Sequence, residues 1–573
     1  MELSRKQFVA GAAAATALAG IAQVASAEEA RPDWMPEAWD RECDVVVVGT
    51  GSIISAALRA DALGLDVLVL EKHPTWFGGT TAFSGGGMSC PNSTQALALG
   101  NREIPRDQLK DYMMEVAEGQ SSEELIDMML DNYAPSVDFM NNECGYTWGA
   151  FPPAEEGQSW SFYYPLHPVT HEYKDAPTFV SIGMHEATGT VMGRAIANFG
   201  KDAVDARGIE VLMGTPATKL IYSGNPMLGN GEVVGVWAET PEGNPIAIKA
   251  RYAVVLGTGG FDHNREMMAN YINHPIYSTP AIPTNTGDGH IMAMEVGANM
   301  KSMNEVFNHT VNMMGHPDLY ESVDLSLEDG TYCCEQRNKA WATIGCTGSI
   351  MVNRRGQRFC CEGGSYDLLG RAFDAYDNST RDWLNIPGYL VFDGTYTGAF
   401  GFGAPTLKQL LAEGELPEWL HAFDTMEDLA DGMGIDKESL LATVARWNEM
   451  CEEGVDLDWH RGEEVWDRYT TGDASRVESG ELKNPCMAPL VEGPFYCIEI
   501  YPSLLTTSGG MEINGNAQVK NVRGEVIPRL YAGSNCIASP TGRGYALSGT
   551  ANANGFVVGY VAANHIATLQ PWE

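Results

Sequence analysis

The feature that most constrains this sequence is a glycine turn joining an apolar strand to a helix near the N-terminus. The apolar run Cys43–Val48 ends at Gly49, and a helical stretch follows from about Ser52 to Leu63. A second apolar run, Asp66–Glu71, completes a βαβ unit. Short apolar runs of this kind are typical of buried parallel strands, so we expect an α/β fold.

The same unit carries the features of a dinucleotide site. Gly49 and Gly51 let the chain turn tightly and let the following helix face a pyrophosphate with its N-terminus. Glu71 ends the second strand 20 residues after Gly51, where a carboxylate can bind a ribose hydroxyl. The third glycine position of the pattern holds Ile54, so the motif alone leaves open a glycine turn of another doubly wound fold.

Further glycine-rich segments extend the dinucleotide interpretation along the chain. Their backbone amides and hydroxyls can approach a flat ring and phosphates closely. Spread over most of the chain, they are too many for a nicotinamide site. They are Gly78–Gly87, Val254–Gly260, Thr286–Gly289 and Leu530–Asn535.

The 573 residues exceed what one hydrophobic core usually organises, so we expect two domains. The pattern of Gly208–Leu212 predicts a strand, and the run Glu232–Leu256 predicts strands joined by a hairpin. Residues 304–484 are richer in Met, Trp and Cys and include a helical stretch near Lys437–Cys451. A final apolar helix is predicted from about Ala551 to Thr568.

Charge and cysteine content exclude several classes of partner and cofactor. The formal net charge is −39 and no basic cluster interrupts it, which disfavours nucleic acid and anionic lipid. The twelve cysteines include no C-x-x-C, and without C-x-x-C-H a c-type haem is excluded. We expect the cysteines to be packed in the interior.

The first 27 residues are typical of a targeting segment. A basic start, Ser4–Phe8, precedes an Ala-rich apolar run, and Ala25–Ala27 fits a small-residue cleavage site. The segment resembles a twin-arginine export signal, with Lys6 in place of the second arginine, so ordinary secretion stays open. The apolar run is short of the roughly 20 residues of a membrane anchor. We expect an exported protein with no transmembrane span in the mature chain.

Together these segments resemble the flavoprotein family of fumarate reductases and 3-ketosteroid dehydrogenases, over essentially the whole mature chain. The resemblance implies FAD in an extended pose. It also implies a Rossmann-like FAD-binding domain built from residues 40–303 and 485–573, with an inserted α+β capping domain at 304–484. The helix after Gly549 would aim its N-terminus at the flavin pyrimidine edge.

The resemblance assigns cofactor binding to residues in these glycine-rich segments and around them. They are Gly49, Gly51, Glu71, Lys72, Gly78, Gly79, Thr80, Thr81, Gly86, Gly87, Ala217, Thr258, Gly259, Asp288, Asn535, Ala551 and Asn552.

Three positions distinguish the branches of the family. Fumarate reductases carry an arginine, a histidine and a second arginine where this sequence has Tyr366, Thr506 and Ala546. A dicarboxylate needs cationic partners, so the substitutions disfavour fumarate reduction.

Two other segments resemble 3-ketosteroid dehydrogenases. Cys361–Tyr366 corresponds to the segment with their proton-transfer tyrosine, and Gly544–Gly549 contains the tyrosine and glycine that hold the substrate ketone, here Tyr545 and Gly549. A hydroxyl and a backbone N–H on one carbonyl oxygen form an oxyanion hole. The supporting tyrosine of the family is Tyr163 or Tyr164, although a hydrophobic wall fits that segment equally well.

We therefore expect an exported FAD-dependent oxidoreductase that acts on a CH–CH bond next to a carbonyl. The favoured reaction is reduction of a cyclic enone, with hydride from flavin N5 to the β-carbon and a proton from Tyr366 to the α-carbon. Tyrosine has a usual pKa of about 10 and is therefore ready to donate a proton. An external electron donor or acceptor, such as a membrane cytochrome or quinol-linked protein, would complete the cycle.

Three alternatives remain open from the sequence. The same site could run as a 3-ketosteroid dehydrogenase in the oxidative direction. It could reduce unsaturated acids, using cations such as Arg371 or Arg543. The protein could also be a flavin electron carrier without a substrate.

Overall fold

The computed structural model describes most of the chain after the expected export signal. Residues 1–27 and Tyr163 lie outside the described part, so the predictions made for them are untested. The described residues are 35–98, 103–149, 164, 168–173, 179–226, 228–277, 279–308, 344–398, 406–414 and 416–572.

The larger of two main sheets combines strands from both ends of the chain. Its central strand, β1 (Arg41–Val48), pairs in parallel with β2 (Val67–Glu71) and β9 (Pro245–Leu256). The parallel order continues through β6 (Glu210–Met213) beyond β2 and β21 (Val526–Ala532) beyond β9. The predicted α/β fold, assembled from N- and C-terminal parts, is confirmed.

Antiparallel strands extend this sheet on the β9 side. β7 (Ala217–Tyr222) pairs with β8 (Val233–Glu239), and β8 pairs with β9, which confirms the predicted hairpin. At the edge, β20 (Gln518–Lys520) pairs antiparallel with β21. The predicted strand at residues 208–212 is β6.

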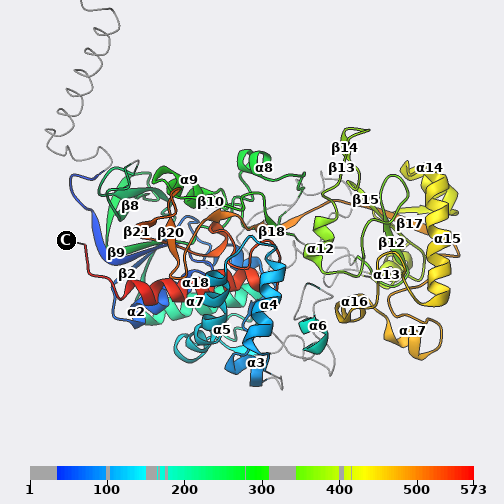
Figure 1. Ribbon diagram of the computed structural model, residues 1–573, viewed down its shortest axis with the longest axis horizontal. Helices are drawn as coiled ribbons and strands as arrows, with labels where there is room; N and C mark the ends of the chain where they lie inside the picture. The colour runs from blue at the N-terminus through cyan, green and yellow to red at the C-terminus, as the bar shows by residue number, and fades with distance from the viewer. Residues whose placement is uncertain are drawn as a thin grey trace, which may run out of the picture.

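Two helices at opposite ends of the sequence pack against each other beside this sheet (Figure 1). They are α2 (Ile54–Ala62) and α18 (Thr550–Ile566), which confirm the two helices predicted there. A Cβ atom at Gly555 would lie 1.8 Å from the Ser52 hydroxyl oxygen, so only glycine allows this approach. The close contact fixes the N-terminus of α18 relative to the first glycine turn.

Smaller elements surround the larger sheet. They are η1 (Gly79–Phe83), β3 (Gly87–Ser89), α3 (Thr94–Ala98), α4 (Arg106–Val116), α5 (Glu123–Cys144), β4 (Trp148–Gly149), α6 (Pro168–Glu172), β5 (Phe179–Ile182), α7 (Met192–Arg207), α8 (Arg265–Tyr271), α9 (Asp288–Glu295), β10 (Met300–Lys301), β19 (Gly510–Met511) and η2 (Ser534–Cys536).

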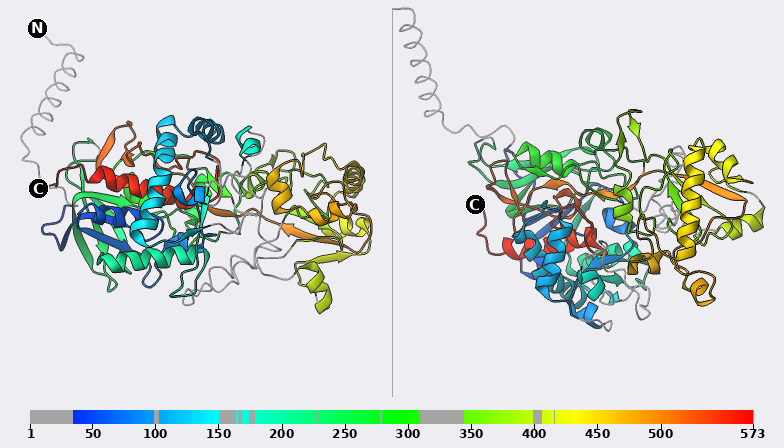
Figure 2. Two further views of the ribbon diagram at one scale, coloured as in Figure 1. Left: turned by 90° about the horizontal axis from the view of Figure 1, so that it is seen from below. Right: turned by 45° about the vertical axis from the view of Figure 1, so that its right-hand side comes forward.

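A second, antiparallel sheet forms its own hydrophobic clusters at the other end of the elongated molecule (Figure 2). Its order is β12 (Ser349–Val352), β15 (Gly388–Phe392), β17 (Phe495–Ile500) and β16 (His421–Phe423). β17 begins after the predicted domain boundary at residue 484, yet it pairs with β15 and β16. The second sheet therefore continues past that boundary to residue 500.

Helices and a small hairpin accompany the second sheet. The predicted helix near residues 437–451 is confirmed as α15. These elements are β13 (Tyr376–Asp377), β14 (Asp382–Trp383), α13 (Leu407–Glu413), α14 (Met426–Met433), α15 (Lys437–Glu453), α16 (Val465–Thr470) and α17 (Ala474–Glu478).

Four buried charged side chains form a group beside the second sheet. We call this group the cap network, and it consists of Arg358, Glu362, Asp456 and Arg461. Arg358 donates to both Glu362 oxygens (2.8 and 2.6 Å) and to both Asp456 oxygens (3.1 and 2.8 Å). Arg461 lies 3.6 Å from Glu362, and none of the four side chains is more than 4 % exposed. The network joins the 358–362 segment to the 456–461 segment beside the second sheet.

One short helix, α12 (Tyr366–Arg371), lies between the two sheets (Figure 1). It contacts β11 (Val306–Asn308), which pairs antiparallel with β18 (Leu504–Thr507). All cysteines of the described residues are buried free thiols except Cys361, which is half-buried. Within the described part of the chain, no helix has the length and apolar character to cross a bilayer.

Candidate active site

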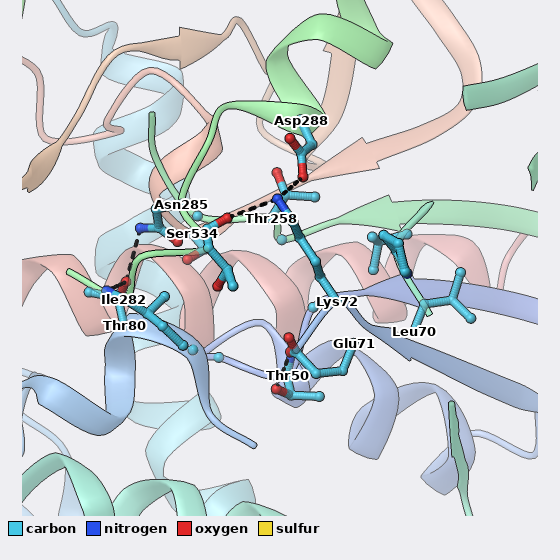
Figure 3. Close-up of a pocket in the computed structure, with 18 of the residues that line it drawn as sticks. Thr50, Leu70, Glu71, Lys72, Thr80, Thr258, Ile282, Asn285, Asp288 and Ser534 are labelled. Atoms are coloured by element: carbon cyan, nitrogen blue, oxygen red, sulfur yellow. Dashed lines mark hydrogen bonds and ion pairs between the residues drawn. The ribbon is translucent and has the colours of Figure 1, made fainter. Parts of the chain in front are cut away.

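A cleft opens where the parallel strands β1, β2 and β9 end (Figure 3). It brings together twelve of the residues predicted to bind the cofactor, from turns far apart in the sequence. They are Gly49, Gly51, Glu71, Lys72, Gly79, Thr80, Thr81, Ala217, Thr258, Gly259, Asp288 and Asn535.

The first glycine turn is built around the end of β2. Gly49 has φ of 110°, and a Cβ there would lie 2.3 Å from the Gly257 carbonyl oxygen, so this position requires glycine. Thr50 donates its backbone N–H (3.2 Å) and its hydroxyl (2.5 Å) to one carboxylate oxygen of Glu71. Burial raises the pKa of Glu71 above its ordinary value, although these hydrogen bonds oppose the rise. The carboxylate thus stands in the cleft beside the turn, as predicted.

Lys72 and Asp288, both predicted to contact the cofactor, bind each other across the cleft (Figure 3). The Lys72 ammonium lies 2.7 Å from the Asp288 carboxylate and donates to the Thr286 hydroxyl at 2.6 Å. The pair brings no net charge to the cleft. Backbone amides and the start of α2 therefore remain the main partners for a pyrophosphate.

A buried polar atom in the cleft indicates that a ligand belongs there. The side-chain oxygen of Asn535 is buried and has no hydrogen-bond partner among the described residues. Such an atom costs stability unless a ligand or water satisfies it. With the glycine turns and Glu71, the cleft fits the nucleotide part of an extended dinucleotide such as FAD.

The other five predicted cofactor residues lie outside the lining of this cleft. Gly78 donates its N–H to the Thr50 hydroxyl (2.9 Å) and so supports the first turn. Asn552, at the start of α18, donates to the Gly87 carbonyl oxygen at 2.7 Å, and Gly86 precedes that residue. Ala551 packs in the aromatic cluster described next. Gly86, Gly87, Ala551 and Asn552 therefore lie at or beside the N-terminus of α18.

The three tyrosines predicted to act in catalysis meet in one aromatic cluster at that helix end. The rings of Tyr366 and Tyr545 lie 5.6 Å apart, and Trp466 lies 6.5 Å from the Tyr366 ring. Phe307 packs against Tyr545 at 5.0 Å, and Tyr164 joins the same cluster. The cluster combines apolar ring faces with phenol groups, which suits a flat, largely apolar molecule carrying a polar group.

Gly549, predicted to donate its amide to a substrate oxygen, directly precedes α18. Its φ is 79°, and a Cβ there would lie 2.5 Å from the Met88 backbone nitrogen. The glycine thus lets the start of α18 and the 545–549 segment pack closely on β3.

One residue that contacts this cluster was not predicted from the sequence, namely Asp367, which follows Tyr366 and is fully buried. Its carboxylate accepts the Tyr164 hydroxyl and the Tyr545 backbone N–H, both at 3.1 Å. Burial, and then the Asp367 charge, raise the pKa of Tyr164 well above its usual range. The hydroxyl of Tyr164 is therefore engaged by the Asp367 carboxylate.

The two arginines considered as carboxylate clamps are both paired with acids. Arg371 lies 3.3 Å from Asp367 and 3.2 Å from Glu305. Arg543 lies 2.7 Å from Glu118 and 3.5 Å from Glu305. Neither arginine therefore offers an uncompensated charge to a substrate carboxylate.

Several lining residues of the cleft were also missed. Thr50 and Ser534 lie inside glycine-rich segments that pointed to the site, and Asn285 precedes Thr286–Gly289 by one residue. Their proximity to those segments is the signal that could have found them. The described residues contain no cluster of three or more histidine, cysteine or acidic side chains that could hold a metal ion.

Comparison with known proteins agrees with this geometry. Residues 44–551 match the FAD binding domain family. The 4-oxocyclohexanecarboxylate 2-dehydrogenase of Sinomonas cyclohexanicum is 30 % identical over 91 % of this chain and 92 % of its own. The digoxin reductase of Eggerthella lenta is 28 % identical, over 99 % of this chain and 94 % of its own.

A solved structure is also similar to this chain over most of its length. The 3-ketosteroid delta1-dehydrogenase from Sterolibacterium denitrificans, in complex with 1,4-androstadiene-3,17-dione, has a TM-score of 0.76 at 25 % identity. The match covers 92 % of this chain and 99 % of that one. The chain belongs to the FAD binding domain family and is an FAD-dependent oxidoreductase that acts on CH–CH bonds.

Proposed function

We propose that this enzyme reduces the carbon–carbon double bond of a cyclic, uncharged α,β-unsaturated ketone. The observation that carries the proposal is the aromatic cluster, in which the rings of Tyr366 and Tyr545 lie 5.6 Å apart. An apolar, ring-lined site of this kind favours a flat neutral substrate over a charged one.

In this mechanism the carbonyl oxygen of the substrate accepts hydrogen bonds from the Tyr545 hydroxyl and the Gly549 amide. These donors polarise the enone and stabilise the enolate that forms on its oxygen, and each is worth about 10²–10³ in rate. Tyr366 then donates its proton to the α-carbon. A flavin bound in the cleft would supply the hydride whose addition to the β-carbon forms this enolate, so protonation of the α-carbon by Tyr366 completes the saturated ketone.

The cofactor would be held by the cleft and by the residues that continue from it. Gly49 and Gly51 approach the pyrophosphate, Glu71 binds a ribose, and Asn535 gains a partner for its buried oxygen. The start of α18 provides positive potential for the pyrimidine edge of the ring system.

Charge compensation around the site argues against a dicarboxylate substrate. Arg371 and Arg543 are each paired with carboxylates, and the positions of two further family cations hold Thr506 and Ala546. Thr506 is buried, and its hydroxyl donates to Asp262 at 3.4 Å. A second negative group on the substrate would therefore find little compensation.

The oxidative direction is the second candidate, because similar proteins bear names of both kinds. The Sinomonas relative is named a dehydrogenase of a cyclic ketone and the Eggerthella relative a reductase. Reduction is favoured here because a tyrosine acid needs no lowered pKa.

We also propose that the enzyme is exported and exchanges electrons with another protein. The support is the basic and then Ala-rich sequence of residues 1–27 and the absence of any haem-attachment motif from the sequence. A membrane cytochrome or quinol-linked protein is the proposed partner. Replacing Arg5 with Gln should retain the protein in the cytoplasm, as cell fractionation would measure, and unchanged export would contradict the twin-arginine route.

The substrate class is tested by reducing the flavin-loaded protein anaerobically with limiting dithionite and then adding acceptors. Flavin absorbance should return within seconds with a steroid-type or other cyclic enone and far more slowly with fumarate or acrylate. Faster reoxidation by a carboxylate would refute the proposal in favour of a reductase of unsaturated acids. Reoxidation by none of them would instead indicate an electron carrier.

A further inference from the structure

We propose that Asp367 and Arg371 form a two-point clamp, the α12 clamp, which sets the spacing between Tyr366 and Tyr545. The inference rests on the proposed function, in which Tyr366 gives a proton to the α-carbon while Tyr545 holds the carbonyl oxygen. The two clamp residues lie four positions apart, one helical turn along α12, and Tyr366 begins the same helix.

The first point of the clamp is the carboxylate of Asp367. One of its oxygens accepts the Tyr545 backbone N–H at 3.1 Å and the Tyr164 hydroxyl at 3.1 Å. The other oxygen accepts the Asn308 backbone N–H at 3.1 Å. Each carboxylate oxygen thus accepts a backbone N–H, which can only donate, so an amide would place its NH₂ group against one of these donors in either orientation.

The second point is the guanidinium of Arg371. It donates to the Arg543 carbonyl oxygen (2.5 Å) and to Asp367 (3.3 Å), and Glu305 holds its third nitrogen at 3.2 Å. Arg543 stands two residues before Tyr545. The planar guanidinium thus fixes α12 to the chain on one side of Tyr545, while Asp367 fixes it at Tyr545 itself.

The clamp joins the proton donor to the groups that hold the carbonyl. Tyr366 begins α12, whereas Tyr545 lies in the segment that leads into α18. Proton transfer to carbon requires contact within hydrogen-bonding reach, and a misplacement of about 1 Å can cost about 10²-fold in rate. Asp367 and Arg371 are therefore positioning residues that act through the two tyrosines.

A buried carboxylate that only stabilises the fold should affect unfolding but not the rate of reoxidation. Asp456 of the cap network provides this matched control for Asp367. Asp456 is also a fully buried carboxylate that accepts hydrogen bonds from an arginine, Arg358 at 3.1 and 2.8 Å. It has no hydrogen bond to Tyr164 or Tyr545 among those described. Loss of its charge should weaken folding without displacing α12.

The test uses the full-length, flavin-loaded protein and the variants Asp367→Asn, Arg371→Lys and Asp456→Asn. Flavin reduction by dithionite, then reoxidation by a cyclic enone, is followed by stopped flow in H₂O and D₂O. In Asp367→Asn, the amide nitrogen would face donors, so reoxidation should slow about 10²-fold with the dithionite step unchanged. The solvent isotope effect on reoxidation should rise, because protonation becomes more nearly rate-limiting.

Arg371→Lys should give the same pattern with a smaller loss of about tenfold, because Lys keeps the charge but not the planar fork. If Asp367→Asn does not fold, the Arg371→Lys variant alone tests the clamp. Asp456→Asn should lower the thermal midpoint but keep the wild-type isotope effect. Wild-type rates and isotope effects in both clamp variants would overturn the inference, as would the same kinetic change in Asp456→Asn. Wild-type protein that no enone reoxidises would overturn the proposed function, and the clamp with it.

Discussion

Two groups of paired carboxylates and arginines include residues close to Tyr366 in the sequence, and the groups differ in what they connect. The cap network joins residues between 358 and 461, all within the body of the second sheet. The α12 clamp instead reaches back to Tyr164 and forward to Tyr545. The same chemistry therefore stabilises a domain in one place and sets the spacing of reacting groups in the other.

The largest effect is expected from removing the group that the clamp holds in position. Tyr366→Phe keeps the ring but loses the proton, so enone-dependent reoxidation should fall about 10²–10⁴-fold. Flavin content and dithionite reduction should match wild type. Stopped-flow absorbance measures both steps, and a variant that reoxidises at the wild-type rate would remove Tyr366 from the mechanism.

Breaking the cap network should cost stability rather than chemistry. Arg358→Leu leaves Glu362 and Asp456 buried without their main cation, which should lower the free energy of unfolding by about 3–5 kcal/mol. Chemical unfolding of the flavin-loaded protein measures this loss. If the folded fraction of the variant also reoxidises tenfold more slowly, the two charge groups are not functionally distinct.

A third carboxylate beside the cap network should make stability depend on pH. Burial raises the pKa of Asp467 to about 6 from an ordinary 3.8, although hydrogen bonds from Gly462 and Cys361 oppose the rise. The folded protein holds this proton more tightly than the unfolded chain does. Its stabilising contribution is therefore present below about pH 4 and is lost as the pH rises to about 6.

Asp467→Asn removes this titration. Relative to wild type, the variant should gain up to about 3 kcal/mol of unfolding free energy between about pH 4 and pH 7. Denaturant titrations of both proteins at the two pH values measure the difference. An equal difference at both values would show that Asp467 titrates normally.

The smallest predicted change concerns Glu305, a carboxylate outside the clamp that pairs with Arg371 at 3.2 Å. Glu305→Gln leaves Arg371 and Arg543 with one compensating charge fewer, so the KM for an unsaturated carboxylate should fall about tenfold, or about 1.4 kcal/mol. The KM for a neutral enone should change less. Glu512→Gln, which removes a carboxylate paired with Lys520 at 2.8 Å, is the control. The same KM shift in both variants would indicate a general charge effect.

Local patterns predicted the elements whose partners are close in sequence. The first glycine turn, the β8–β9 hairpin and α15 follow from apolar periodicity and glycine placement within short windows. The contacts that define the clamp could not be predicted in this way. Asp367 is 203 residues from Tyr164 in the sequence and 178 residues from Tyr545, and no short window contains both partners. The pairing of β17 with β15 was missed for the same reason, since nothing within an isolated strand specifies its partner.

The cleft shows the same limit at the level of single side chains. Its glycines were predicted because backbone geometry restricts those positions to one residue type. Lys72 and Asp288 were predicted individually, but their mutual ion pair depends on a fold that joins residues 216 positions apart.

Identification of the product tests the central claim most directly. Reduced wild-type enzyme is mixed anaerobically with one equivalent of a neutral cyclic enone, and the product is analysed by NMR. The account predicts one equivalent of the saturated ketone for each flavin reoxidised, with the carbonyl intact and new hydrogens on the α- and β-carbons. An allylic alcohol, or reoxidised flavin with unchanged enone, would contradict it.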